Sequence, residues 1–194
     1  MKKVLLILAI ATTAFTNFSC KKESIDPVAG SAQGNVKGNE VILGRVDEPG
    51  GGACPSTTVD LIAGQYYNAG SVTVTNDADY IYVTYTTANG YELTQTHLYV
   101  GPCGSIPVNN PGNPIPGQFP YSGNHNYINT VTYTIPISAI PAGGCGCIAA
   151  HAVVVKRNAS GQVIETQTGW GNGVRINLSG GNWGMKFEYC SCTQ

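Results

Sequence analysis

The sequence predicts an all-β protein, an antiparallel β-sandwich of about eight or nine strands that disulfide bonds stabilise. Hydrophobic and polar residues alternate along most segments, which is the two-residue period of strands with one buried face. The 194 residues include 25 Gly and 11 Pro, residues that mark turns, and no segment shows a sustained helical period. Seven cysteines accompany an N-terminal export signal, and this combination is typical of disulfide-bonded proteins.

The N-terminus has the features of an export signal. Residues 1–3 (MKK) are positively charged, residues 4–11 (VLLILAIA) are apolar, and the small residue Ser19 precedes Cys20. The apolar run is too short to span a bilayer permanently. We therefore expect residues 1–19 to be a cleaved signal peptide and Cys20 to carry acyl chains, palmitate among them, that anchor the protein in a membrane. Cleavage with full secretion is the alternative.

The mature chain divides into a tether and one domain. Residues 20–40 are rich in Gly, Ser and Asn and lack a hydrophobic period, as flexible linkers do. Residues 41–194 are numerous enough to bury a core of their own, and we expect them to form the β-sandwich domain.

The expected strands follow one another with short turns between them. A hairpin is predicted over residues 70–87 with its turn at 76–79, because Asn and Asp favour turns. The apolar run at 147–156 predicts a central strand that is buried on both faces. The other predicted strands lie at residues 41–46, 59–63, 91–100, 130–135, 162–168 and 183–189.

The segment 101–126 is rich in Pro and Gly and predicts a long loop. Proline lacks the N–H that a central strand needs, so this segment cannot lie within the sheet interior. Its aromatic residues indicate a packed loop, and long packed loops are often functional.

The six cysteines after Cys20 are predicted to form three disulfides; they are Cys54, Cys103, Cys145, Cys147, Cys190 and Cys192. The pairs 145/147 and 190/192 flank two predicted strands, so we expect them to bridge each other if these strands are antiparallel neighbours. A third bridge would then join Cys54 to Cys103. A four-thiolate metal site is the alternative, but zinc ligands are usually spaced by two or more residues.

The charge and the motifs exclude several classes of protein. A formal net charge of -1 argues against a nucleic-acid partner bound through a basic field. The three histidines His97, His125 and His151 are far apart in sequence, so we predict no metal site and no cofactor. The motifs of serine hydrolases, zinc proteases and phosphate-binding loops are absent, and an enzyme is not the favoured interpretation. A hydrolase would have to use Glu165 with His151 or Glu92.

Aromatic residues are the candidate ligand-binding residues. Flat aromatic rings beside Asn and Gln amides suit the apolar faces and hydroxyls of sugar rings. The candidates are Phe119, Tyr121, Tyr127, Trp170 and Trp183. Each of them could instead be a core residue.

Two parts of the sequence resemble known proteins. Residues 17–20 (NFSC) resemble a bacterial lipobox, and the following KKES resembles the start of Bacteroidetes-type lipoproteins displayed at the cell surface. Residues 93–101 (LTQTHLYVG), 113–121 (NPIPGQFPY), 148–154 (IAAHAVV) and 182–187 (NWGMKF) are similar to a recurrent all-β module of exported proteins that has no established activity. Related copies read Glu-Thr-Ala-Trp where this chain has ETQTGW.

Together these features predict an outer-membrane lipoprotein at the cell surface, with a non-enzymatic domain for recognition or adhesion. The predicted partners are the membrane, through the lipid anchor, and a glycan or surface protein. A structural component of the cell envelope is the alternative function.

Overall fold

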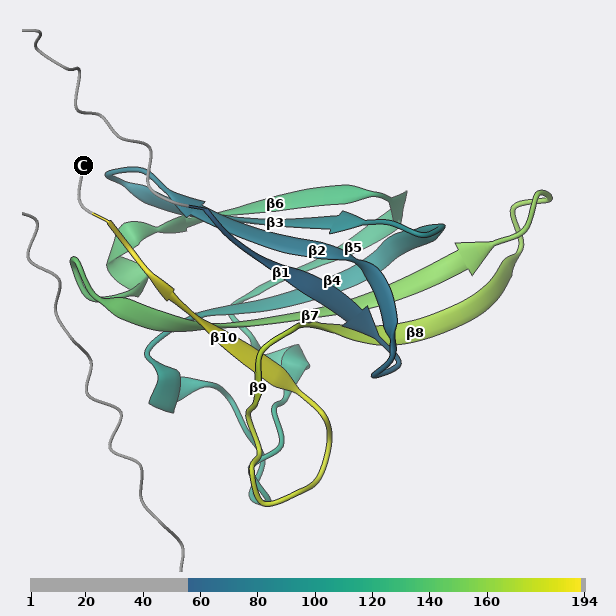
Figure 1. Cartoon of the computed structure of the whole chain (residues 1–194). Coiled ribbons are helices and arrows are strands. Elements are labelled where there is room, and N and C mark those ends of the chain that lie inside the picture. Colours follow the sequence, from purple (N-terminus) through teal and green to yellow (C-terminus); the bar gives the residue numbers. More distant parts are fainter. Residues whose placement is uncertain (1–55, 193–194) are drawn as a thin grey trace, which may run out of the picture. The chain divides into compact units, whose positions relative to one another are not determined.

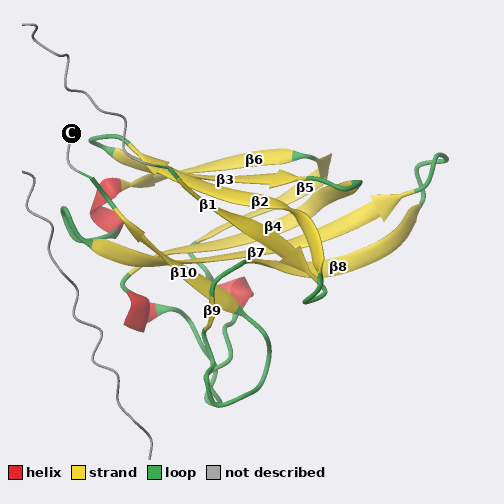
Figure 2. Cartoon of the chain, in the orientation of Figure 1, coloured by secondary structure: helices red, strands yellow, loops and turns green. Residues whose placement is uncertain are grey.

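A computed structural model describes residues 56–192, which form ten antiparallel strands and three short 3₁₀ turns (Figures 1 and 2). The predicted all-β fold with disulfides is therefore confirmed. Eight strands follow one path in the order β5-β4-β7-β8-β1-β2-β3-β6, and β10 pairs with β7 and with β9. The predicted tether and the predicted strand at 41–46 lie outside the described residues.

One half of the path consists of four neighbouring strands in the order β1-β2-β3-β6. They are β1 (Thr57–Ala63), β2 (Tyr67–Asn76), β3 (Tyr80–Thr87) and β6 (Thr130–Pro136). The predicted hairpin over 70–87 is confirmed as β2 and β3. Its turn is stabilised by Asp77, whose Oδ1 accepts hydrogen bonds from the backbone N–H groups of Asp79 at 2.9 Å and Tyr80 at 2.7 Å.

The other half of the path and the two strands beside it contain the two longest strands, β4 and β7, and the shortest, β9. The strands of this part of the fold are β4 (Tyr91–Gly101), β5 (Tyr121–Ile128), β7 (Cys145–Arg157), β8 (Val163–Gly171), β9 (Val174–Arg175) and β10 (Met185–Cys190). Residues 146–152 of β7 are all buried, which confirms the prediction of a central strand covered on both faces.

The path folds on itself around the main core, to which both halves contribute. The largest fully buried side chains of this core include Leu61, Val72, Tyr85, Leu98 and Ile148. The two ends of the path meet at buried Thr96 of β4. Its Oγ1 lies 2.7 Å from Nε2 of His125 on β5 and 2.6 Å from the hydroxyl of Tyr133 on β6. Side chains thus join the end strands, and the sheet is nearly closed.

A second, smaller apolar cluster covers the outer face of β4, β7 and β8. Its buried members are Tyr99, Ile106, Phe119, Cys147, Ala149 and Trp170. The loop after β4 and the loop between β9 and β10 lie against each other on this side of the sheet (Figure 1). Asn113 joins these loops, since its Oδ1 accepts hydrogen bonds from Asn177 Nδ2 and from the backbone N–H of Asn182, each at 3.0 Å.

The predicted loop at 101–126 is shorter than expected, because its last residues belong to β5. Before β5 the chain makes the 3₁₀ turns Cys103–Ser105 and Pro116–Gln118. The prediction missed β5 because this strand pairs only with β4 along the path, and a strand at the end of a sheet lacks a long apolar run.

The disulfide prediction is correct for one of the three bridges and wrong for the other two. Cys145 of β7 pairs with Cys190 directly opposite on β10. Cys103 bridges Cys147, so the predicted bridge from Cys103 to Cys54 and the predicted bridge from Cys147 to the 190/192 pair are both wrong. The reason is that β7 has β10 along one edge and β4 along the other, so its two cysteines meet different neighbours. Cys192 is also disulfide-bonded, and Cys54 lies outside the described residues.

In the described part of the chain, no helix has the length and apolar composition needed to cross a membrane.

Candidate functional site

The five predicted ligand-binding aromatics lie in three different places. Phe119 and Trp170 are 5% and 4% exposed, with ring centroids 6.2 Å apart, and they pack inside the outer cluster. Trp183 is half-buried against the same cluster. The burial of Phe119 and Trp170 leaves them little surface for a ligand, whereas Trp183 is only half-buried.

The other two predicted residues lie elsewhere. Tyr121 is half-buried beside Tyr133, 6.5 Å away between ring centroids, at the margin of the main core. Tyr127 is exposed at the far end of the sheet, where the guanidinium of Arg157 lies 4.4 Å above its ring. Arg157 also forms an ion pair with Glu92 at 2.6 Å. The five aromatics therefore do not form one binding surface.

A hollow beside Trp183 does collect aromatic, amide and cationic groups. It has a volume of about 530 Å³ and is lined by Ile62, Gln65, Tyr66, Asn172, Arg175, Trp183 and Met185. This volume lies within the usual range for small-molecule sites. The lining comes from the β1–β2 turn on one side and from the loop around β9 on the other. The two walls are separated by more than 100 positions in the chain, so the sequence does not reveal most of these residues as neighbours.

The β1–β2 turn presents an exposed aromatic ring to the hollow. Gly64 and Gln65 have φ values of 55° and 73°, and the N–H of Tyr66 donates to the carbonyl of Ala63 at 3.1 Å. Two positive φ values describe a tight turn that matches the twist of a hairpin. Glutamine is rarely found in this conformation, and such local strain clusters at functional sites. The turn leaves Tyr66 81% exposed, an unusual position for a large aromatic residue.

The opposite wall is held by close backbone contacts. The N–H of Asn172 donates to the carbonyl of Asp60 on β1 at 2.8 Å, and that of Ile176 donates to the carbonyl of Gly184 at 2.9 Å. A Cβ atom on Gly173 would collide with the backbone of Lys186, so this position requires glycine. The wall that carries Arg175 and Trp183 is thus tied to the sheet.

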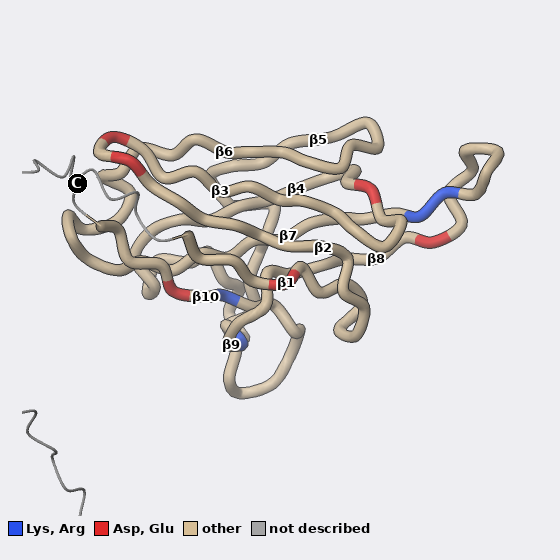
Figure 3. The backbone as a smooth tube through the Cα atoms, turned by 45° about the horizontal axis from the view of Figure 1, so that its top comes forward, with Lys and Arg blue, Asp and Glu red and all other residues tan. Residues whose placement is uncertain are grey.

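The electrostatics of the hollow come from Arg175. Within residues 56–192 the ion pairs are Lys156 with Glu165 and Arg157 with Glu92. The exposed guanidinium of Arg175 consequently has no carboxylate partner in this part of the chain. Figure 3 shows few charged residues on the β-domain. Arg175 belongs to β9. The hollow can offer a cation, two amides and two aromatic faces to a ligand.

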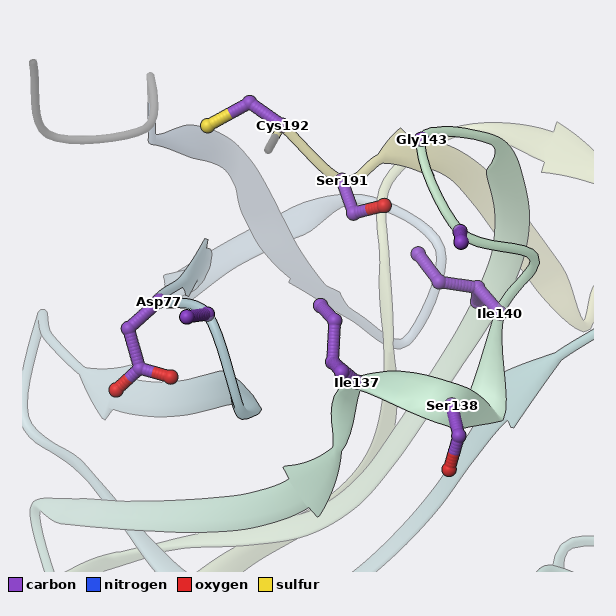
Figure 4. A pocket seen from close by; sticks show the side chains of 9 residues that line it. Asp77, Ile137, Ser138, Ile140, Gly143, Ser191 and Cys192 are labelled. Atoms are coloured by element: carbon purple, nitrogen blue, oxygen red, sulfur yellow. The ribbon is translucent and has the colours of Figure 1, made fainter. Parts of the chain in front are cut away.

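A second hollow lies near the C-terminal end of the described chain (Figure 4). Its volume is about 290 Å³, and Ile137 and Ile140 provide much of its apolar wall, next to Ser191 and Cys192. It lies at the lower limit of small-molecule sites and lacks aromatic and cationic groups. It is the weaker candidate.

The residue pairs that a hydrolase would need are not formed. His151 lies opposite Trp170, and Lys156 lies opposite Glu165, in the same unbroken register between β7 and β8. Side chains alternate between the two faces of a sheet, so residues five positions apart point to opposite faces. Glu165 instead accepts a hydrogen bond from the hydroxyl of Tyr91 at 2.8 Å, on the face that bears the main core.

The same alternation separates the two carboxylates. Glu92 lies opposite Val155, and Val155 lies opposite Thr166, the immediate neighbour of Glu165. Glu92 and Glu165 thus face opposite sides of the sheet.

In the described segment, no three or more His, Cys, Asp and Glu side chains come together as a ligand group.

The fold and the hollow define a disulfide-bonded, antiparallel β-domain with an aromatic, cationic surface site. The chain matches no protein-family model, no curated protein and no solved structure.

Proposed function

We propose that this protein is an exported lipoprotein, anchored through Cys20 at the outer membrane and displayed at the cell surface, whose β-domain recognises a glycan. The leader at residues 1–19 and the KKES segment after Cys20 support the export and the display. The disulfides Cys103–Cys147 and Cys145–Cys190 suit an oxidising compartment.

The observation that carries the recognition function is the hollow between Tyr66 and Trp183. Aromatic faces stack on the C–H faces of sugar rings, while amides such as those of Gln65 and Asn172 bond to hydroxyl groups. Arg175, which has no carboxylate partner within residues 56–192, favours a sugar with a carboxylate, sulfate or phosphate group. A guanidinium binds such anions through two parallel hydrogen bonds.

A glycan array probed with the mature, oxidised protein tests this function. We expect binding to be strongest for anionic glycans and to weaken at least about tenfold in Tyr66→Ala and in Trp183→Ala, a loss of about 1.4 kcal/mol. Tyr80→Ala is the matched control, since Tyr80 is an exposed tyrosine outside the hollow. Unchanged binding in both hollow variants, or no glycan binding by the parent protein, would contradict the proposal.

The lipid anchor has a separate test. Mass spectrometry of the native protein should find an acylated Cys20 as the first residue, and Cys20→Ser should release the protein from membranes. Each buried CH₂ group of an acyl chain contributes about 0.8 kcal/mol, so several chains hold the protein stably. An intact leader in the mature protein would disprove the anchor.

A structural role in the cell envelope is the second candidate, favoured by the burial of Phe119 and Trp170. These residues contribute to packing and not to an exposed surface. This function predicts that cells without the protein have a weaker envelope. A variant in which Tyr66 and Trp183 are both replaced should support the envelope as well as the parent protein does.

A further inference from the structure

Two histidines that are 54 residues apart in sequence face each other on the sheet. His97 of β4 and His151 of β7 lie directly opposite in the antiparallel register. Side chains at opposite positions project from the same face, here the outer face. His97 is half-buried and His151 is 8% exposed. The ring of Trp170 on β8 packs edge-on against His151, with ring centroids 4.9 Å apart, and limits the motion of this imidazole.

The ring nitrogens of the pair have the separation of two metal ligands. Nδ1 of His97 lies 3.3 Å from Nδ1 of His151. Imidazole nitrogens bind Zn²⁺ at about 2.0–2.1 Å, and two such ligands at a tetrahedral angle are roughly 3.3–3.4 Å apart. The strands thus hold both nitrogens at this spacing without rearrangement of the backbone.

The two Nδ1 atoms share one hydrogen, since they lie within hydrogen-bond distance of each other. Burial and the nearby His97 lower the pKa of His151 from 6.5 to about 4. Burial also lowers the pKa of His97. Binding of one metal ion by both Nδ1 atoms therefore requires this shared hydrogen to move to Nε2 of its ring or to solvent, so the affinity should rise with pH.

We infer that His97 and His151 form a two-histidine site for a divalent transition-metal ion that prefers nitrogen ligands. Among such ions Cu²⁺ should bind most tightly, with Ni²⁺ and Zn²⁺ weaker, as the general order of affinities requires. No third His, Cys, Asp or Glu of the described chain joins the pair, so the other coordination positions remain open to solvent or to an external ligand. This inference is independent of the proposed glycan hollow, which contains neither histidine.

Titration of the mature, oxidised protein with Cu²⁺ tests the site. We expect saturable binding that quenches the fluorescence of Trp170 and gives an electron paramagnetic resonance spectrum with two nitrogen ligands. His97→Ala should weaken this binding at least about tenfold, because a single imidazole remains. His125→Gln is the matched control: it replaces a histidine of β5 that is bonded to Thr96, outside the pair.

A folded His97→Ala variant distinguishes the loss of the metal site from unfolding of the domain. His97 is half-buried, so His97→Ala should keep the thermal unfolding midpoint near that of the parent, which circular dichroism can check. Copper bound elsewhere, for example at a free N-terminus, would persist in His97→Ala. The site is therefore measured by the Cu²⁺ binding that the parent protein shows and His97→Ala lacks. The inference is overturned if no binding tighter than about 1 mM is found, or if folded His97→Ala binds Cu²⁺ as the parent does.

Discussion

The domain should lose stability as the pH falls below 6.5, because His151 is buried in its neutral form. This side chain is 8% exposed and lies between His97 and Trp170. Burial, and secondly the charge of His97, lower its pKa from 6.5 to about 4. A buried imidazole resists protonation because a charge in an apolar surrounding loses its hydration.

The loss of stability at low pH follows from the difference in proton binding between the folded and the unfolded chain. Between these two pKa values the unfolded chain binds a proton at His151 and the folded chain does not, so acid favours unfolding. The contribution of His151 is fully present above pH 6.5 and is lost as the pH falls to about 4. The interval between the two values corresponds to about 3 kcal/mol, a large part of the stability of a small domain.

Urea unfolding at a series of pH values, with intact disulfides, measures this loss. We expect His151→Gln to show a shallower pH dependence than the parent between about pH 6.5 and about pH 4. Carboxylates that titrate in the same range are common to both proteins, so their effect cancels in the comparison. His97→Gln removes a neighbouring charge and should raise the pKa of His151. If parent and His151→Gln lose stability in parallel, the reasoning is refuted.

Three further changes test the packing of the sheet. Gly70→Ala should cost about 2 kcal/mol or more in urea unfolding, since φ is 140° and a Cβ would collide with a backbone carbonyl of β3; an unchanged midpoint would contradict this. Replacing Cys145 and Cys190 together by Ser opens a loop of 45 residues and should lower the free energy of unfolding by up to about 4 kcal/mol, measured without reductant. Tyr85→Phe removes the hydrogen bond from its hydroxyl to the backbone oxygen of His97 and should cost about 1 kcal/mol, with a larger loss pointing to a packing defect.

Much of the fold could be predicted from the sequence because local patterns determine local structure. The alternation along residues 70–87 identified a hairpin, and the apolar run at 147–156 identified the strand with two buried faces. The polar strand β5 was missed because it contributes little to the core, so no apolar alternation marks it.

The candidate site was less predictable. Trp183 was identified as an aromatic residue that could bind a ligand, but Tyr66, Gln65 and Arg175 become its neighbours only when the β1–β2 turn approaches the loop around β9. Trp170 has the same residue type as Trp183, yet it is buried by the loop after β4. Residue type gives the chemistry of a side chain, whereas the neighbouring segments decide whether it meets solvent.

The sequence by itself determined that the chain forms strands, where most of them turn, and that its cysteines would pair. Only the tertiary structure decided that Cys147 meets Cys103 and that His97 meets His151. The physical reason is that a period of two residues sets which face of a strand is buried, but it carries no information on which strand lies alongside. That choice depends on the packing of the whole domain, where all strands compete for the same core.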